Sequence, residues 1–477
     1  MLMLGLLLSS LLFYKQILPF YFISDDFDTI IKYKSFFDFI KIGQYDIHYS
    51  PVIRLINHLL TQFAWPNPTP FHIFSIFIHL LNIFLVYKIA QTFIKNRLKS
   101  SLAALIFAFF FGNYEVVFWF AAINNSLLVT FYLTALIFFI DYLSSKKTFS
   151  FILYQLSFLL ALFTHEYAIS LFPVLFIYWL MNSKLKNINE IFKLFLFPLV
   201  VFLATTILKL IFVKMPLFVR TFSLLKSIVF TLRSFVYLFI PNPYIVDKLS
   251  NFVMPIVFLM ILFLLIKLTN NKKSLFLLIW GLMTIFLYSI TSAPQARYFY
   301  ISYVPISIYI LSVIRFGKVK LLNFLQVFYL IFIFISGVSF LQNQVVFWRL
   351  NSQITKNVIN TLNKTYESNG TNMTNGSNKA NWSNETHESN GVIYFVNLPD
   401  SANDSLWKAY VFRSGFVNLL NKVVHIYPKK IIFLTSYSPS KHTINALYVS
   451  PDKLKSLSKN NQVFVYKEDI KTVFLLR

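Results

Sequence analysis

Residues 71–119 read FHIFSIFIHLLNIFLVYKIAQTFIKNRLKSSLAALIFAFFFGNYEVVFW, and this stretch decides the fold class. It contains two apolar runs, 71–94 and 100–119, separated by a short basic cluster. A helix of about 20 apolar residues is long enough to cross the hydrocarbon core of a bilayer. The stretch therefore predicts two transmembrane helices with a basic connection between them.

The same pattern extends over most of the 477-residue chain, of which 57% is hydrophobic and 13% charged. A soluble domain carries about 25% charged residues, so the composition excludes an ordinary soluble protein. The chain has no cysteine, which excludes disulfides, thiol catalysis and Cys-ligated zinc. We expect about eleven transmembrane helices, at 1–23, 71–94, 100–119, 126–143, 150–163, 167–181, 191–213, 252–268, 274–292, 298–314 and 321–341.

Basic clusters occupy alternate connections between these spans. By the positive-inside rule they face the cytoplasm, which puts the N-terminus inside and the C-terminal region outside. This alternation requires the apolar segment 222–240 to lie as an interfacial or re-entrant helix. The clusters are Lys95, Arg97 and Lys99; Lys146 and Lys147; Lys184 and Lys186; Lys267, Lys272 and Lys273; and Arg315, Lys318 and Lys320.

The net charge of +25 alone would suit nucleic acid or an anionic surface. Because the basic residues lie between apolar spans, we expect membrane lipids as partners and no nucleic acid. The first span could instead be a cleaved signal peptide, but it lacks a basic start and a small-residue cleavage site. We therefore predict an integral protein of the cell membrane.

The composition changes after residue 341. A polar, low-complexity tract cannot form a packed core, whereas the short β-branched and aromatic runs beyond it predict strands. We expect strands at 391–397, 430–437, 446–450 and 462–466, with a helical stretch at 403–421. The predicted organisation is a transmembrane domain at 1–341, a helix and linker at 342–390, and a small extracytoplasmic α/β domain at 391–477.

The first predicted outward loop, residues 24–70, opens with Asp25 and Asp26 directly after a span. Adjacent carboxylates repel each other, so one of them can accept a proton or bind a cation. A helix N-cap is the competing interpretation. Amphipathic helices are expected at 28–42 and 52–64, and Arg54 on the second either binds a lipid phosphate or only anchors the helix.

Three later outward turns carry further candidates. Glu115 lies at the end of an apolar span, where a carboxylate is costly unless it has a role or a partner. His165 and Glu166 form a short turn suited to proton or metal chemistry, although a lone His-Glu pair is a weak signal. Arg297 precedes Tyr298 at an outward helix end, as a phosphate-binding residue or as an interfacial anchor.

Four short motifs follow one another in residues 20–180. They are Tyr49-Ser50-Pro51-Val52, Phe71-His72 with His79 and Asn82, Glu115 to Trp119, and His165-Glu166. With these motifs the chain resembles the GT-C glycosyltransferase superfamily, and within it the branch of protein O-mannosyltransferases and transmembrane O-mannosyltransferases bearing tetratricopeptide repeats. The chain departs from that branch at His165, where many relatives have Lys, and it has no such repeats.

The resemblance implies a transmembrane catalytic domain that moves a hexosyl or pentosyl group from a polyprenyl-phosphate carrier to an acceptor hydroxyl outside the cytoplasm. The acceptor would be a protein, a lipid or a glycan. No cofactor is implied with certainty, although paired acids hold a divalent cation in some members of the superfamily. The implied roles are a general base at Asp26 or Asp25, donor phosphate binding at Arg297, Arg54 and His165, and pocket residues at Glu115, Glu166 and Tyr298.

Two other classes of function compete with this interpretation. A transporter or lipid-linked-sugar flippase would need mid-membrane charges and inverted repeats with broken helices. The sequence has few such charges, since Lys15 and Lys209 lie towards span ends, and no repeat is evident. A non-catalytic membrane scaffold would leave Asp25, Asp26 and Glu115 without a role.

Overall fold

The computed structural model describes residues 2–30, 50–182, 188–212, 224–269, 271–291, 295–314, 320–370, 392–401, 407, 410–412, 416–424, 430–436, 447–458 and 461–476. Its described residues form two compact units, one of helices and one around a β-sheet. The first unit contains Met1–Gln16, Lys32–Phe63 and Phe71–Gln342, and the second contains Ile17–Ile31, Ala64–Pro70 and Asn343–Arg477.

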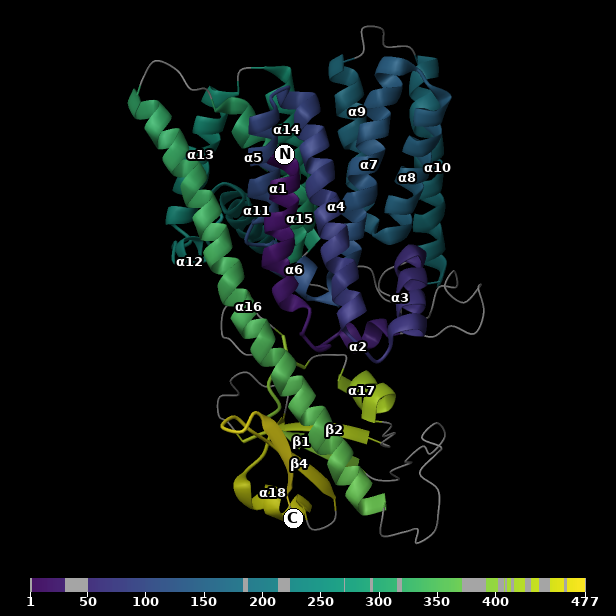
Figure 1. The fold of residues 1–477 in the computed structure, drawn as a ribbon, viewed down its shortest axis with the longest axis vertical. Coiled ribbons are helices and arrows are strands. Elements are labelled where there is room, and N and C mark those ends of the chain that lie inside the picture. The colour runs from purple at the N-terminus through teal and green to yellow at the C-terminus, as the bar shows by residue number, and fades with distance from the viewer. Residues whose placement is uncertain are drawn as a thin grey trace. The chain divides into compact units, whose positions relative to one another are not determined.

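Side-by-side helices build the first unit (Figure 1). Short 3₁₀ turns at Lys15–Ile17, Phe120–Ala122 and Glu166–Ser170 link some of them. The helices are α1 (Leu2–Tyr14), α3 (Pro51–Ala64), α4 (Thr69–Ile94), α5 (Arg97–Ala108), α6 (Asn113–Phe118), α7 (Ile123–Ser145), α8 (Thr148–Thr164), α9 (Leu171–Asn182), α10 (Ile188–Phe212), α11 (Leu224–Phe239), α12 (Pro243–Val246), α13 (Val253–Leu268), α14 (Lys272–Thr291), α15 (Ala296–Val313) and the first part of α16 (Lys320–Gly370).

Five stretches of described helix are long and apolar enough to cross a membrane. They are Thr69–Ile94, Phe120–Ser145, Asn189–Ile207, Lys272–Ser289 and Asn323–Tyr366. Five shorter apolar helices of 10–17 residues accompany them. The chain is thus a helical protein suited to a membrane, whereas the count of eleven spans and the orientation stay predictions.

Buried polar side chains of α4 join it to three other helices. The ring nitrogen Nδ1 of His79 lies 2.7 Å from the Tyr300 hydroxyl, and Nε2 lies 3.3 Å from the Ala108 carbonyl oxygen. Thr130 donates to Asn82 Oδ1 at 2.8 Å. Polar groups within an apolar bundle need such partners, so His79 and Asn82 fasten α4 to α5, α7 and α15.

The segment predicted to be interfacial or re-entrant, residues 222–240, contains α11. This helix packs on α13, α14 and α15. The ring of Phe235 lies 4.7 Å from that of Phe258 on α13, and the ring of Tyr237 lies 5.7 Å from that of Phe299 on α15. The helix is therefore part of the first unit's core, and its relation to the membrane stays a prediction.

One helix, α16, runs through residue 341, where the sequence predicts the end of a span. It is continuous over 51 residues and contains no proline. Gly337 allows a close approach, because a Cβ there would collide with the carbonyl oxygen of Phe109. The change from apolar to amphipathic sequence at 341 alters the helix surface without ending the helix.

The second unit is built around a five-stranded sheet of order β3-β2-β1-β4-β5. The strands β3, β2, β1 and β4 are parallel, and β5 is antiparallel to β4. The strands are β1 (Val392–Val396), β2 (Lys430–Thr435), β3 (Leu447–Tyr448), β4 (Gln462–Lys467) and β5 (Thr472–Leu476), with α2 (Asp26–Thr29), α17 (Phe416–Leu419), a π-helical turn at Leu420–Val424 and α18 (Pro451–Ser458). Both β5 and α18 are absent from the sequence-based expectation.

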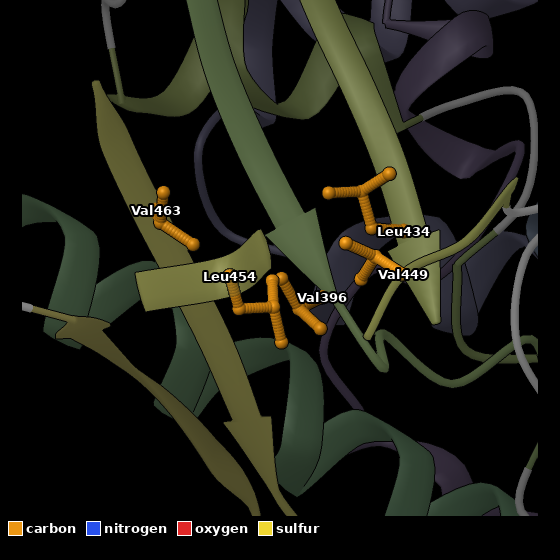
Figure 2. Close-up of a cluster of buried hydrophobic side chains, with 5 residues drawn as sticks. All are labelled: Val396, Leu434, Val449, Leu454 and Val463. Carbon is orange, nitrogen blue, oxygen red and sulfur yellow. The ribbon is translucent and has the colours of Figure 1, made fainter. Parts of the chain in front are cut away.

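A small apolar core lies on one face of this sheet (Figure 2). Leu454 of α18 points towards Val396 of β1, and Val463 of β4 lies beside them. Val396 and Val463 are fully buried. Burying side chains of this size contributes about 1.5–3 kcal/mol each, which fixes α18 on the sheet.

Both ends of the predicted first loop belong to the second unit, which includes Ile17–Ile31 and Ala64–Pro70. The backbone N–H of Ser24 donates to the carbonyl oxygen of Val411 at 2.9 Å, and that of Tyr21 donates to the Ser352 hydroxyl at 2.5 Å. These bonds join residues more than 300 positions apart, a pairing that no local pattern reveals. The predicted helix at 28–42 lies largely outside the described residues.

Candidate functional site

Three segments far apart in the sequence meet in the first unit: α6, the 3₁₀ turn after α8, and the start of α15. They carry Glu115, His165 with Glu166, and Arg297 with Tyr298. Each of these five residues is a candidate from its own turn of the sequence, and no local pattern predicts that they are neighbours. Their contacts form the candidate site, and we call them the Arg297 cluster together with Trp119, Tyr167 and Tyr288.

An ion pair between Glu115 and Arg297 is the centre of the cluster. The backbone N–H of Arg297 also donates to Glu115 Oε2 at 3.0 Å. This N–H belongs to the first turn of α15, which has no side-chain cap from Gln295. Helix starts attract anions because their N–H groups lack partners within the helix. Glu115 therefore caps α15 and binds its arginine at once.

A glycine makes this pairing possible. A Cβ on Gly112, the residue before α6, would lie 2.8 Å from the carbonyl oxygen of Ala296, the residue before Arg297. Real Cβ atoms essentially never approach backbone oxygen so closely. Only glycine therefore lets the start of α6 reach the start of α15, and this brings Glu115 to Arg297.

Aromatic rings surround the arginine. The guanidinium carbon of Arg297 lies 5.5 Å from the ring centre of Trp119 and 5.1 Å from that of Tyr298, both within cation–π range. Tyr298 in turn stacks on Tyr288 of α14 at 4.5 Å, and Tyr288 contacts Tyr167 at 3.7 Å. The rings thus connect Arg297 to the turn that carries His165.

His165 is 3% exposed and stacks on Tyr167 at 5.0 Å. Its Nδ1 accepts the N–H of Tyr167 at 3.3 Å and also lies 3.7 Å from Glu166 Oε2. A nitrogen that accepts an N–H carries no proton, so we regard the approach to Glu166 as a contact of neighbours and not an ion pair. In the neutral ring the proton then sits on Nε2.

Arg54 lies on α3, a different element from the three that form the Arg297 cluster. It is 8% exposed, on the same buried side as Ile53 and Asn57. The interpretation as a simple surface anchor does not fit this burial, because a buried guanidinium requires hydrogen-bond or anionic partners. Its assignment to donor phosphate stays a prediction.

The paired acids of the first loop lie in the second unit. Asp26 is 1% exposed, and its Oδ2 accepts the backbone N–H of Ile23 at 3.0 Å. Asp25 is half-buried, and its Oδ1 accepts the hydroxyl of Ser24 at 3.2 Å. Ser24 has a φ of 50°, the left-handed region. The turn therefore holds the two carboxylates in different environments: Asp26 in a buried backbone contact, Asp25 closer to solvent.

Two residues that the sequence analysis does not select hold this acidic segment. Asn418 donates to Asp28 Oδ1 at 2.6 Å, and Lys422 Nζ donates to the carbonyl oxygens of Phe27 at 3.0 Å and Ile30 at 2.6 Å. Burial lowers the pKa of Lys422, and nearby Asp28 opposes that shift. Lys422 therefore fastens both ends of α2 to the C-terminal part of the chain.

No group of three or more His, Asp or Glu among the described residues could hold a metal ion. The divalent cation that the resemblance allows stays untested. Neither the protein-family models, nor the curated proteins, nor the solved structures contain a match for this chain. The function must therefore be argued from the chemistry of the two groups of residues described above.

Proposed function

We propose that the chain is a membrane glycosyltransferase that moves a sugar from a polyprenyl-phosphate carrier to an acceptor hydroxyl on the extracytoplasmic side. In this proposal the Arg297 cluster binds the donor phosphate, and a first-loop carboxylate, Asp26 or Asp25, is the general base. The proposal rests on the resemblance to the GT-C superfamily and on the chemistry of the residues themselves.

The observation that carries the proposal is the convergence of Glu115, His165 and Arg297 from three segments. A structural ion pair needs only Glu115 and Arg297. Two basic side chains, Arg297 and His165, and the aromatic rings that connect them supply the chemistry of the proposed anion site. Guanidinium groups bind phosphate oxygens in pairs, and rings around them exclude water and strengthen the interaction.

The proposed reaction exchanges one bond at the anomeric carbon of the sugar. The acceptor oxygen forms a bond to this carbon while the bond from the carbon to the phosphate oxygen breaks. The hydroxyl proton passes to the carboxylate of Asp26 or Asp25, and polyprenyl phosphate leaves as an anion. Arg297 and His165 stabilise the negative charge that develops on the leaving phosphate. Glu115 holds Arg297 in position.

The test uses the purified chain in proteoliposomes with a panel of polyprenyl-phosphate-linked hexoses and pentoses, each labelled in the sugar. A cell-envelope fraction supplies mixed acceptors. We expect label to move from lipid to acceptor with at least one donor. The Arg297→Lys variant keeps the charge but loses the paired donors, so its rate should fall, with His165→Phe as a second variant that removes a donor.

Two outcomes would contradict the proposal. Movement of an intact donor across the bilayer without sugar transfer would favour the flippase alternative. Transfer at the wild-type rate in both variants would remove the Arg297 cluster from the reaction.

The proposed orientation has its own test, because the chain has no cysteine and any introduced thiol is unique. A thiol at Lys147→Cys should react with a membrane-impermeant reagent only in inverted vesicles or opened cells. A thiol at Lys453→Cys, on the exposed side of α18, should react in intact cells. Labelling of both from one side would contradict the orientation.

A further inference from the structure

A cavity lies at the opposite end of the first unit's helices from the Arg297 cluster. Its volume is about 670 Å³, and its lining includes the starts of α5 and α14. The helix α14 runs from Lys272, at this cavity, to Tyr288, in the Arg297 cluster. Sixteen residues of α-helix span about 24 Å, so the two sites lie nearly a membrane thickness apart.

Four lysines line this cavity: Lys95 in the connection before α5, Lys99 in the first turn of α5, and Lys272 and Lys273 at the start of α14. No Asp or Glu is among the described residues around it. Four like charges around one cavity repel each other, and an anion bound among them would remove that repulsion. The two connections are the basic clusters that the sequence analysis assigns to the cytoplasmic side.

Two helix starts add to this positive potential. The side chain of Asn96 accepts the N–H of Lys99 at 3.0 Å at the start of α5, and that of Asn271 accepts the N–H of Ser274 at 2.8 Å at the start of α14. Each cap satisfies one N–H of a first turn, while the helix dipoles still point their positive ends at the cavity. Phosphate groups bind at such helix starts.

The cavity wall is packed, not loosely assembled. The ring of Phe93 stacks on that of Phe276 at 5.6 Å, and the hydroxyls of Ser274 and Ser312 lie 3.1 Å apart across α14 and α15. Lys99 is half-buried, and its Nζ donates to the carbonyl oxygen of Ile314 at 2.6 Å. One cation is thus positioned by the fold, whereas Lys95, Lys272 and Lys273 are exposed at the rim.

We propose that this cavity is a binding site for a phosphoryl group, carried either by an anionic lipid headgroup or by a free phosphate compound. The lysines and the two helix starts bind the phosphoryl oxygens, and the apolar wall at Phe93 and Leu277 accommodates a less polar part of the ligand. The site is separate from the proposed transferase site and does not depend on that function.

The test compares two probes on the purified full chain in neutral detergent. Phosphatidic acid, with phosphatidylcholine as the zwitterionic reference of zero net charge, is followed by native mass spectrometry. Inorganic pyrophosphate is followed by the shift in Tm. We expect at least one probe to bind the wild-type chain. The Lys272→Gln/Lys273→Gln variant should bind the same probe about tenfold or more weakly, because charge-assisted hydrogen bonds are lost.

The matched control is Lys88→Gln/Lys267→Gln, which removes two exposed lysines that do not line the cavity. Lys272→Arg/Lys273→Arg is the charge-conserving variant. The control and the charge-conserving variant should both bind the probe as tightly as the wild type. Binding of phosphatidic acid alone identifies a lipid headgroup, and binding of pyrophosphate identifies a free phosphate compound. Failure of both probes on the wild-type chain, or equal loss in the control, would overturn the proposal.

Discussion

The two ends of the first unit hold their cations in opposite ways. At one end a single arginine, Arg297, is bound to the buried Glu115 and covered by aromatic rings. At the other end four lysines surround a cavity, and no acid is found among its described lining residues. The half-buried Arg297 is neutralised by its ion pair and held in one orientation. The lysines, three of them exposed, have no acidic partner among the described lining residues and create a positive potential.

This difference predicts how each end responds to mutation. Removing Arg297 leaves a buried carboxylate without its ion pair, which is costly. Removing a rim lysine takes away repulsion and leaves the backbone untouched. The predictions below use this contrast, beginning with the largest expected effect.

The Arg297→Gln variant should lose about 3–5 kcal/mol of stability, because Glu115 stays buried without its ion pair. The measurement is the change in Tm in detergent, calibrated with denaturant. Lys273→Gln at the other end is the matched control and should stay within about 0.5 kcal/mol of wild type. Similar losses of stability in Arg297→Gln and Lys273→Gln would contradict the difference between the two ends of the first unit.

The Gly112→Ala variant tests whether close approach positions the ion pair. The new Cβ would collide with the Ala296 carbonyl oxygen, so we expect the stability to fall by about 1–3 kcal/mol and the ion pair between Glu115 and Arg297 to weaken. Gly5→Ala is the control, since a Cβ at Gly5 meets nothing within 4 Å. If Gly112→Ala proves as stable as Gly5→Ala, the close approach is not needed for the pair.

Lys422 offers a third case, a half-buried cation bonded to neutral carbonyl oxygens. Replacing it with Met should cost about 1–3 kcal/mol, from the two hydrogen bonds to Phe27 and Ile30.

The pH dependence of this lysine has a defined sign. Its folded pKa is lowered below the ordinary 10.5, so between the two values the unfolded chain binds more protons and stability rises with pH. The stability of the wild type relative to Lys422→Met should therefore increase as the pH approaches 10.5. A flat or falling difference in a pH series of unfolding measurements would contradict the burial of Lys422.

The smallest effect concerns salt. Relief of repulsion in Lys272→Gln/Lys273→Gln should raise the stability by about 0.2–1 kcal/mol at low ionic strength. Salt screens exposed charges over about 10 Å at 0.1 M, so the gain should vanish as salt is added. The effect of Arg297→Gln should depend less on salt, because Glu115 is buried and Arg297 is only 19% exposed. A salt-independent gain at the lysine end would contradict an electrostatic origin.

The sequence alone identifies three candidate site residues in turns between predicted spans. Glu115, His165 and Arg297 are polar residues at the ends of apolar helices, where their presence is costly and therefore informative. Their convergence could not be predicted, because it depends on Gly112 and on how α6, α8 and α15 pack. Tyr288 was missed because a tyrosine inside an apolar run looks like ordinary core.

The contacts of the C-terminal residues with α2 could not be predicted from local sequence patterns. Lys422 is one of many lysines in a tail with no motif, and its partners Phe27 and Ile30 lie more than 390 positions away. In helix α16 the change in composition at residue 341 lies within one continuous helix that contains no proline. The division between the two units falls directly after it, between Gln342 and Asn343.

The most direct test of the account is sugar transfer by Asp26→Asn and Asp25→Asn in the proteoliposome assay with labelled donors. Both variants should insert and bind detergent like wild type, and loss of the general base should slow transfer about 100- to 10,000-fold in at least one of them. Full transfer activity in both variants, or no transfer by the wild-type chain from any donor in the panel, would contradict the proposed glycosyltransferase.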